Sequence, residues 1–136
     1  MAIRVISNIN LQIFADTSKK DCLFNLSDDS TTLTMDSFEE SNSGRLQLAA
    51  SAAGSIPLGG IAAGKGVFIQ ADQDLDIVLN GGSDTLQLRK HAASTTSAPT
   101  FVPFFFMGEV TSVAVTNASS TESVNITYAV FGDPTA

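Results

Sequence analysis

Apolar residues recur at every second position in most segments of this 136-residue sequence. The last such segment is the clearest, because Val124, Ile126, Tyr128 and Val130 alternate with polar or small residues. A period of two sends successive side chains to opposite faces of an extended strand, so it predicts strands with one buried face. Helical stripes are hard to find. The alternation therefore restricts the chain to an all-β fold.

The same pattern, interrupted by turn residues, divides the chain into short strands. We expect strands or extended segments at residues 3–5, 9–14, 22–26, 31–38, 45–49, 67–71, 75–79, 85–88, 101–107, 110–116 and 124–131. Residues 39–44 read as a polar turn and residues 50–66 as mostly loop, which Ile56, Leu58 and Ile61 attach to the core. Regularly spaced short strands without long helices predict one domain over residues 1–136, a two-sheet antiparallel β-sandwich or jelly roll.

A hairpin is the clearest local prediction. The sequence Asn80-Gly81-Gly82-Ser83 separates strand 75–79 from strand 85–88. Its glycines can adopt the positive φ that a tight turn between antiparallel strands requires. We therefore expect these two strands to pair.

Composition argues against several classes of partner. The chain carries seven basic and fourteen acidic residues, a net charge of −7, which opposes contact with nucleic acid. Its apolar stretches are shorter than the roughly 20 residues that a membrane-spanning helix needs, so no membrane is expected. The single cysteine, Cys22, cannot form an internal disulfide, and the N-terminal residues lack the apolar region of a secretory signal. Folding in a reducing cytosol is the simplest expectation.

The residue types that carry catalysis and metal binding are scarce. His91 is the one histidine and lies in an Ala/Ser/Thr-rich loop, whereas Cys22 has apolar neighbours and no nearby base. One cysteine and one histidine cannot complete a four-coordinate zinc site. The sequence therefore predicts no enzyme, no catalytic residue, no metal and no cofactor.

Three motifs resemble functional sites only superficially. Asp72, Asp74 and Asp76 have the spacing of a calcium loop, but Ile77 and Ser83 stand where its glycine and glutamate belong, so a solvated strand face is the better interpretation. Gly64-Lys65-Gly66 lacks the Ser or Thr of a phosphate loop. Triplets of the Asn-x-Ser/Thr type begin at Asn25, Asn117 and Asn125, and chance in a Ser/Thr-rich chain explains them.

The segment Phe101-Val102-Pro103-Phe104-Phe105-Phe106-Met107 is the main anomaly. A strand sends consecutive phenylalanines to opposite faces, so one sheet can bury only part of this set. Either the strand is central and a loop covers its back, or Phe101, Phe104 and Phe106, or else Phe105, contact another subunit. The apolar N-terminal residues Ile3, Val5 and Ile6 pose a similar choice, between a strand of the domain and an arm at residues 1–15 that crosses a neighbour.

Part of the sequence resembles a known class of protein. The resemblance covers residues 55–132 and is carried by Ile56-Pro57-Leu58-Gly59-Gly60-Ile61, by Asp76-Ile77-Val78-Leu79-Asn80-Gly81-Gly82 and by Glu109-Val110-Thr111-Ser112-Val113-Ala114-Val115-Thr116-Asn117. These residues resemble the small β-sandwich virion proteins of tailed bacteriophages. The resemblance implies a head decoration, or cement, protein that is made in the host cytoplasm and binds the major capsid protein on the capsid exterior. It also implies self-association as a trimer or dimer.

Two other functions remain open at this stage. The protein could belong to the phage tail, as an adaptor or fibre-associated module. It could instead be a carbohydrate-binding β-sandwich, although such proteins usually stack sugars on exposed Trp or Tyr. The chain has no Trp, and its single Tyr, Tyr128, falls on a predicted core face.

Overall fold

The computed structural model of the chain describes residues 3–8, 12–14, 22–25, 32–90 and 101–134, and the side chains of residues 4–6, 39–90 and 101–134. Two units are distinguished, Met1–Phe38 and Glu39–Ala136. The described part of the chain contains strands and no helix, which confirms the all-β prediction.

Two antiparallel strand pairs lie among the described residues of the first unit. Strand β1 (Ile3–Asn8) pairs with β4 (Thr32–Phe38), and β2 (Gln12–Phe14) pairs with β3 (Cys22–Asn25). The predicted strands of this region are confirmed where residues are described. The arm expected at residues 1–15 stays a prediction. Residues 9–11, which were expected to be extended, lie outside the described part.

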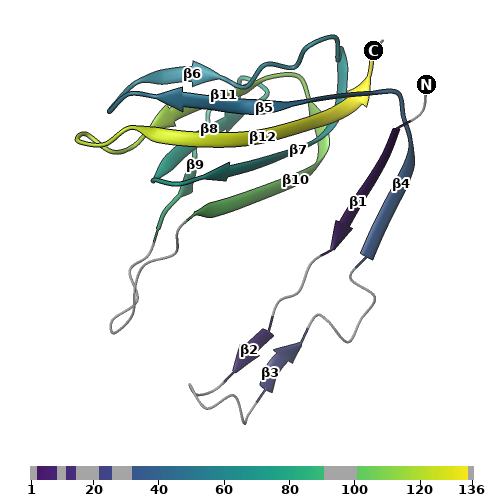
Figure 1. The fold of residues 1–136 in the computed structure, drawn as a ribbon, viewed down its shortest axis with the longest axis horizontal. Coiled ribbons are helices and arrows are strands. Elements are labelled where there is room, and N and C mark those ends of the chain that lie inside the picture. The colour runs from purple at the N-terminus through teal and green to yellow at the C-terminus, as the bar shows by residue number, and fades with distance from the viewer. Residues whose placement is uncertain (1–2, 9–11, 15–21, 26–31, 91–100, 135–136) are drawn as a thin grey trace. The chain divides into compact units, whose positions relative to one another are not determined.

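The described part of the second unit contains eight strands in two antiparallel sheets (Figure 1). One sheet has the order β10-β7-β12-β5 and the other the order β6-β11-β8-β9. The strands are β5 (Glu40–Leu48), β6 (Ala53–Ser55), β7 (Ala63–Ala71), β8 (Leu75–Leu79), β9 (Leu86–Leu88), β10 (Val102–Val110), β11 (Val113–Asn117) and β12 (Val124–Asp133). The predicted two-sheet antiparallel β-sandwich is therefore confirmed.

The strand pairs of this unit are nested. The first strand, β5, pairs with the last, β12, and the next pairs inward are β6 with β11, β7 with β10 and β8 with β9. A long antiparallel hairpin that rolls up on itself gives this pairing, with adjacent strand pairs falling in alternate sheets. It is the topology of a jelly roll, the more specific form of the predicted fold.

The core lies between the inward faces of the two sheets. Its side chains alternate along each strand with outward ones, as the period of two requires. The largest fully buried apolar residues are Ile69, Leu75, Ile77, Ile126, Val67, Val110, Val113, Val115, Val124 and Val130. Ile56 and Ile61 are also buried, and Leu58 packs against the core, which confirms that they attach the 56–62 loop.

The predicted hairpin is present between β8 and β9, with Ile77 opposite Leu86. The turn that follows β8 runs from Leu79 to Gly82. The Gly82 N–H donates to the Leu79 carbonyl at 3.0 Å. Asn80 and Gly81 have φ of 56° and 64°, the conformation of a type I′ turn. The Asn80 side chain also accepts from the Thr111 N–H at 2.7 Å, which ties this turn to the β10–β11 connection.

Two local predictions are wrong. Residues 39–44 were expected to form a turn, but they belong almost entirely to strand β5. Asn42 donates to the Pro57 carbonyl at 2.8 Å, and the Tyr128 ring covers Gly44 from the opposite strand, so tertiary contacts stabilise a segment of turn-forming residues as a strand. Residues 53–55 and 63–66, expected to be loop, also form strand.

Candidate interaction surface

The sheet β10-β7-β12-β5 has an outer face that points away from the core. Its side chains form rows across the four strands, because antiparallel register sets one outward residue of each strand opposite the next. From β10 to β5, the rows are Met107, Gly66, Phe131, Ser41; then Phe105, Phe68, Ala129, Ser43; then Pro103, Gln70, Thr127, Arg45. The first two rows are largely apolar, and the third is largely polar.

Four large apolar side chains gather in the first two rows, and we name Phe68, Phe105, Met107 and Phe131 the aromatic patch. The ring centroids of Phe68 and Phe105 are 6.5 Å apart, and so are those of Phe105 and Phe131. Tilted rings at this separation attract each other by about 0.5–1.5 kcal/mol beyond the burial of their area. Phe105 and Met107 nevertheless remain 37% and 39% exposed.

Gly66 shapes the patch. A Cβ atom on this residue would lie 2.3 Å from Cζ of Phe131, so the aromatic ring lies directly over the glycine backbone. Only glycine permits this approach, and the ring in turn covers a backbone that lacks a side chain of its own. The Gly64-Lys65-Gly66 motif is thus a packing feature of strand β7.

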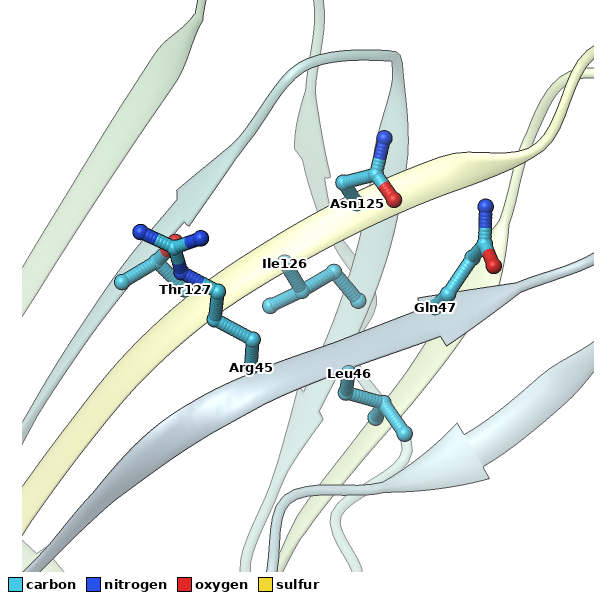
Figure 2. Close-up of a pocket in the computed structure, with 6 residues that line it drawn as sticks. All are labelled: Arg45, Leu46, Gln47, Asn125, Ile126 and Thr127. Carbon is cyan, nitrogen blue, oxygen red and sulfur yellow. The ribbon is translucent and has the colours of Figure 1, made fainter.

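A shallow hollow with polar and apolar lining residues lies on β5 and β12 (Figure 2). Its volume is about 420 Å³, and it is lined by Arg45, Leu46, Gln47, Asn125, Ile126 and Thr127. Figure 2 shows the Arg45 side chain running toward Thr127, while Gln47 and Asn125 stand at paired positions of β5 and β12. The outer face therefore combines an apolar half with a half that can donate and accept hydrogen bonds.

Strand β10 lies at the edge of its sheet, so the expectation of a central phenylalanine strand is wrong. Phe104 and Phe106 point inward and pack against the core, whereas Phe101 and Phe105 are exposed. Pro103 and a bulge between Met107 and Val110 make this edge a poor template for pairing with a strand of another chain. Strand alternation therefore divides the predicted interface residues into an exposed pair, Phe101 and Phe105, and a pair that packs against the core, Phe104 and Phe106.

The N-terminal residues of the predicted interface belong to the first unit. Ile6 is 57% exposed and Val5 is half-buried, whereas the side chain of Ile3 is outside the described part. Two residues of the aromatic patch that keep some exposure, Phe68 and Met107, were missed as interface candidates, whereas Phe131 is buried. Phe68 could have been found from alternation, since it lies next to the core residue Val67 in its strand.

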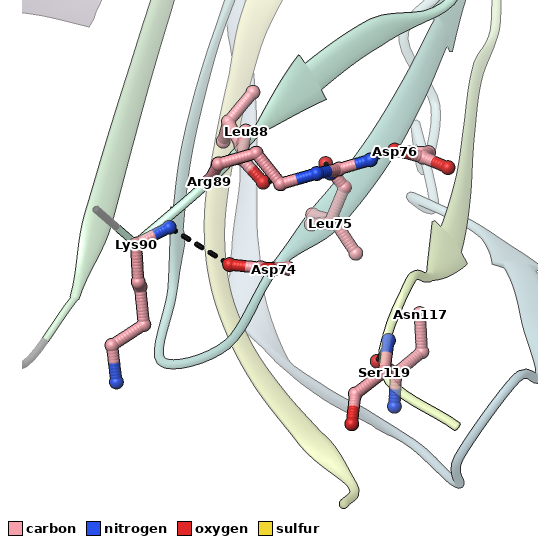
Figure 3. Close-up of polar contacts among 8 residues, drawn as sticks. All are labelled: Asp74, Leu75, Asp76, Leu88, Arg89, Lys90, Asn117 and Ser119. Atoms are coloured by element: carbon pink, nitrogen blue, oxygen red, sulfur yellow. Dashed lines mark hydrogen bonds and ion pairs between the residues drawn. The ribbon is translucent and has the colours of Figure 1, made fainter. Parts of the chain in front are cut away.

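The three aspartates are partly exposed, as a solvated face requires, and each also makes an internal contact. Asp72 accepts from the backbone N–H and the side-chain amide of Asn125, at 2.7 and 2.8 Å. Asp74 accepts from the Lys90 N–H at 2.8 Å, and Asp76 pairs with Arg89 at 2.7 Å (Figure 3). The carboxylates of Asp74 and Asp76 therefore hold the segment after β9 against the start of β8, and the carboxylate of Asp72 holds the turn before β8 against β12.

Asn117 is the buried polar side chain of the described core, at 2% exposure. Its amide donates to the carbonyls of Ala49 and Glu122 at 3.1 and 2.8 Å, and its oxygen accepts from the Ser119 N–H at 2.9 Å. Figure 3 shows it beside Ser119 at the end of β11. A side chain held in this way is inaccessible to glycosylation, in line with the expectation that its Asn-x-Ser triplet arises by chance.

The other candidates for chemistry are not assembled into a site. Among the described residues, no group of three or more His, Cys, Asp or Glu side chains is placed to hold a metal ion. His91 and the side chain of Cys22 fall outside the described part. Within that part, no helix has the length and apolarity to cross a membrane.

No protein-family model, curated protein or solved structure matches the chain. The interpretation of its function therefore depends on the surface itself.

Proposed function

We propose that this chain is a non-enzymatic structural protein of a bacteriophage virion. In this role it decorates the capsid exterior and stabilises the head by binding the outside of the major capsid protein lattice. The observation that carries the proposal is the exposed part of the aromatic patch, Phe105 and Met107, on the outer face of a sheet whose inner face already supplies the core, whereas Phe131 of the same patch is buried. Exposed apolar patches with a polar border mark contacts with other proteins.

The jelly roll suits such a role. Its two sheets share one apolar core, and the described buried side-chain nitrogen and oxygen atoms all have hydrogen-bond partners, so the domain is well suited to act as a rigid block. Rigid blocks lose little conformational freedom when they bind. Many modest contacts repeated over a lattice then add up to strong attachment through multivalency.

The carbohydrate-binding alternative loses support from the placement of Tyr128. This residue is 8% exposed and lies in the core, over Gly44, so it cannot present a ring to a sugar. A tail adaptor or fibre-associated module would use the same aromatic patch for a different protein partner. The location of the chain on the particle distinguishes it from a head protein.

A binding assay on capsids tests the proposal. Purified full-length chain is added to undecorated capsids of the phage whose genome encodes it, and the capsids are sedimented. We expect the chain to sediment with the capsids and to saturate at a fixed ratio to the major capsid protein. Electron microscopy of the complex should show added density on the outer surface. A chain that stays in the supernatant at saturating concentration, or whose density lies on the tail, would contradict the proposal.

A further inference from the structure

We propose that the free edge of strand β5 is a docking site for an extended segment of another protein. The segment adds to the sheet as a fifth strand and places a carboxylate opposite Arg45. The site lies at the other end of the sheet from β10 and uses no residue of the aromatic patch. That the segment belongs to the major capsid protein rests on the proposed function, whereas its chemistry is inferred from β5 alone.

Hydrogen bonds show which backbone groups of β5 face its open edge. The Asp72 N–H donates to the Asn125 carbonyl at 3.2 Å, so the odd-numbered residues of β12 direct their backbone groups toward β7. Its even-numbered residues are therefore directed toward β5, and the Gly132 carbonyl indeed accepts from the Glu39 N–H at 3.1 Å. Register pairs even-numbered residues of β12 with even-numbered residues of β5. The backbone groups at the open edge thus belong to the odd-numbered residues of β5, which are Ser41, Ser43, Arg45 and Gln47.

These four residues form a regular template for another strand. Each offers one backbone N–H and one C=O, and their side chains are exposed. No backbone hydrogen bond from a turn or loop of the described chain reaches them. The register of β5 with β12 is unbroken from Glu40 to Leu48. An added strand can therefore form a continuous hydrogen-bond ladder along β5, as in other cases of strand addition.

The other edges of the two sheets are protected against such pairing. Strand β10 carries Pro103 and a bulge, and the edge strands β6 and β9 have three residues each. Prolines, bulges and very short strands are common ways to prevent pairing at an edge. Strand β5 has nine residues, no proline and no bulge in its pairing with β12. It is therefore the one long, regular edge of these two sheets within the described part.

Arg45 sets the chemistry of the segment. It is exposed, and its guanidinium has no hydrogen-bond or ion-pair partner among the described residues. It borders the hollow on β5 and β12 together with Gln47 and Thr127, whose amide and hydroxyl groups can also donate hydrogen bonds (Figure 2). A guanidinium matches the two oxygens of a carboxylate. We therefore expect an aspartate or glutamate at the position of the added strand that lies opposite Arg45.

The same charge argues against a second copy of β5 as the added strand. Antiparallel pairing of all four outward residues would set Arg45 opposite Ser43 of the second copy. The two arginines would then be diagonal neighbours, a distance that long side chains span, so their like charges would repel. The other outward residues of β5 are neutral and cannot offset this repulsion. A foreign segment with a carboxylate replaces the repulsion by attraction.

A peptide titration of the full-length chain, followed by NMR, tests the inference. The probe is a short synthetic peptide in which Thr and Val alternate around one central Glu, and its control has Lys in place of that Glu. We expect the Glu peptide to shift the backbone amide signals of the four outward residues of β5. It should bind about fivefold more tightly than the Lys peptide at low salt, and the difference should shrink at high salt. Absence of binding at millimolar Glu peptide, or equal affinities of the two peptides at low salt, would overturn the inference.

Ser43→Pro tests the role of the backbone. It removes a donor that faces the open edge, whereas the ladder with β12 uses even-numbered residues. The other long edge strand of this sheet already contains Pro103, so we expect the variant to keep its β-sheet circular-dichroism spectrum. Its affinity for the Glu peptide should fall by at least about tenfold. Ser43→Ala keeps the N–H and, as the matched control, should stay within about twofold of wild type. A folded Ser43→Pro that binds like wild type would contradict strand addition.

A second variant keeps the test decisive if Ser43→Pro does not fold. Arg45→Glu changes an exposed side chain and should reverse the preference, so that the Lys peptide binds more tightly than the Glu peptide. An unchanged preference for the Glu peptide would overturn the inference. So would a wild-type chain that binds neither peptide and forms a dimer that Ser43→Pro abolishes, because the edge would then serve a second copy.

The two proposals fail in different ways. A wild-type chain that binds capsids but neither peptide overturns the inference and leaves the proposed function intact. A chain that binds the Glu peptide along β5 but does not bind capsids supports the inference and contradicts the proposed function.

Discussion

The two faces of sheet β10-β7-β12-β5 contain similar residues and serve different purposes. On β10, Phe104 and Phe106 point into the core while Phe105 and Met107 point outward. The inner side chains gain their free energy when the chain folds, because the second sheet covers them. The outer ones gain much of theirs only when another surface covers them. Hydrophobicity alone therefore does not separate residues for folding from residues for assembly, whereas strand alternation does.

The largest expected effect separates the two faces of β7. Ile69→Ala should lower the free energy of unfolding by about 3 kcal/mol, since it removes a fully buried side chain and leaves a cavity. Urea denaturation followed by circular dichroism measures this loss. Gln70→Ala, one residue along on the outer face, is the control and should cost less than about 0.5 kcal/mol. Equal losses would show that this strand does not have one core face and one outer face.

The second prediction extends the comparison to a polar group on the inner side of the other sheet. Asn117→Ala should cost about 2–3 kcal/mol, because the carbonyls of Ala49 and Glu122 lose their buried donor. Thr116→Ala on the opposite face of β11 serves as the control and should be much milder. Thermal denaturation of both variants checks the prediction. Near-equal melting temperatures for the two variants would mean that water donates to these carbonyls in place of the Asn117 amide, with no loss of stability.

The third prediction compares adjacent phenylalanines. Phe104→Ala should lower the free energy of unfolding of the monomer by about 2 kcal/mol, since this side chain is only partly buried against the core. Phe105→Ala removes two ring contacts and should cost about 1 kcal/mol. Denaturant titrations at low protein concentration, where association does not contribute, give both values. A larger loss for Phe105 than for Phe104 would reverse the assignment of the two faces.

The smallest expected effect concerns the ion pair of Asp76 and Arg89, which lies on the outer side of the second sheet. Both side chains are more than a quarter exposed, at 29% and 28%. Exposed pairs contribute about 0–1 kcal/mol, so Asp76→Asn should cost less than about 1 kcal/mol, and the cost should shrink in high salt. Denaturation at two ionic strengths measures it. A salt-independent loss above 2 kcal/mol would indicate that the pair has a more buried role.

Much of the fold could be predicted from alternation, because one-sided burial leaves a period of two in the sequence. The strand with Val124, Ile126, Tyr128 and Val130 is the clearest case, and all four residues are buried in the core. The hairpin at Asn80-Gly81 was predictable for a local reason, since its turn requires residues that tolerate positive φ.

The first half of strand β5, residues 40–44, could not be predicted because its support is not local. Its Ser, Asn and Gly residues favour turns, and the contacts that make it a strand come from Pro57 and Tyr128, far along the sequence. The edge position of β10 was hidden for the same reason, because the order of strands in a sheet depends on long-range pairing.

The interaction surface was predictable only in part. Alternation indicated that some phenylalanines of residues 101–107 must face outward, but it did not show which ones. The register with β7 and β12 shows that Phe105 joins Phe68 and Phe131. Such a cluster forms from three strands separated in sequence, so no local pattern contains it.

Binding to undecorated capsids, measured by co-sedimentation for Phe105→Ala beside Phe104→Ala at matched concentrations, tests the central claim most directly. The account predicts that folded Phe104→Ala binds like wild type, because its altered side chain packs against the core. It predicts that Phe105→Ala stays mostly in the supernatant at the same concentration. Equal binding of the two variants, or loss of binding by Phe104→Ala alone, would contradict the division between a folding face and an assembly face.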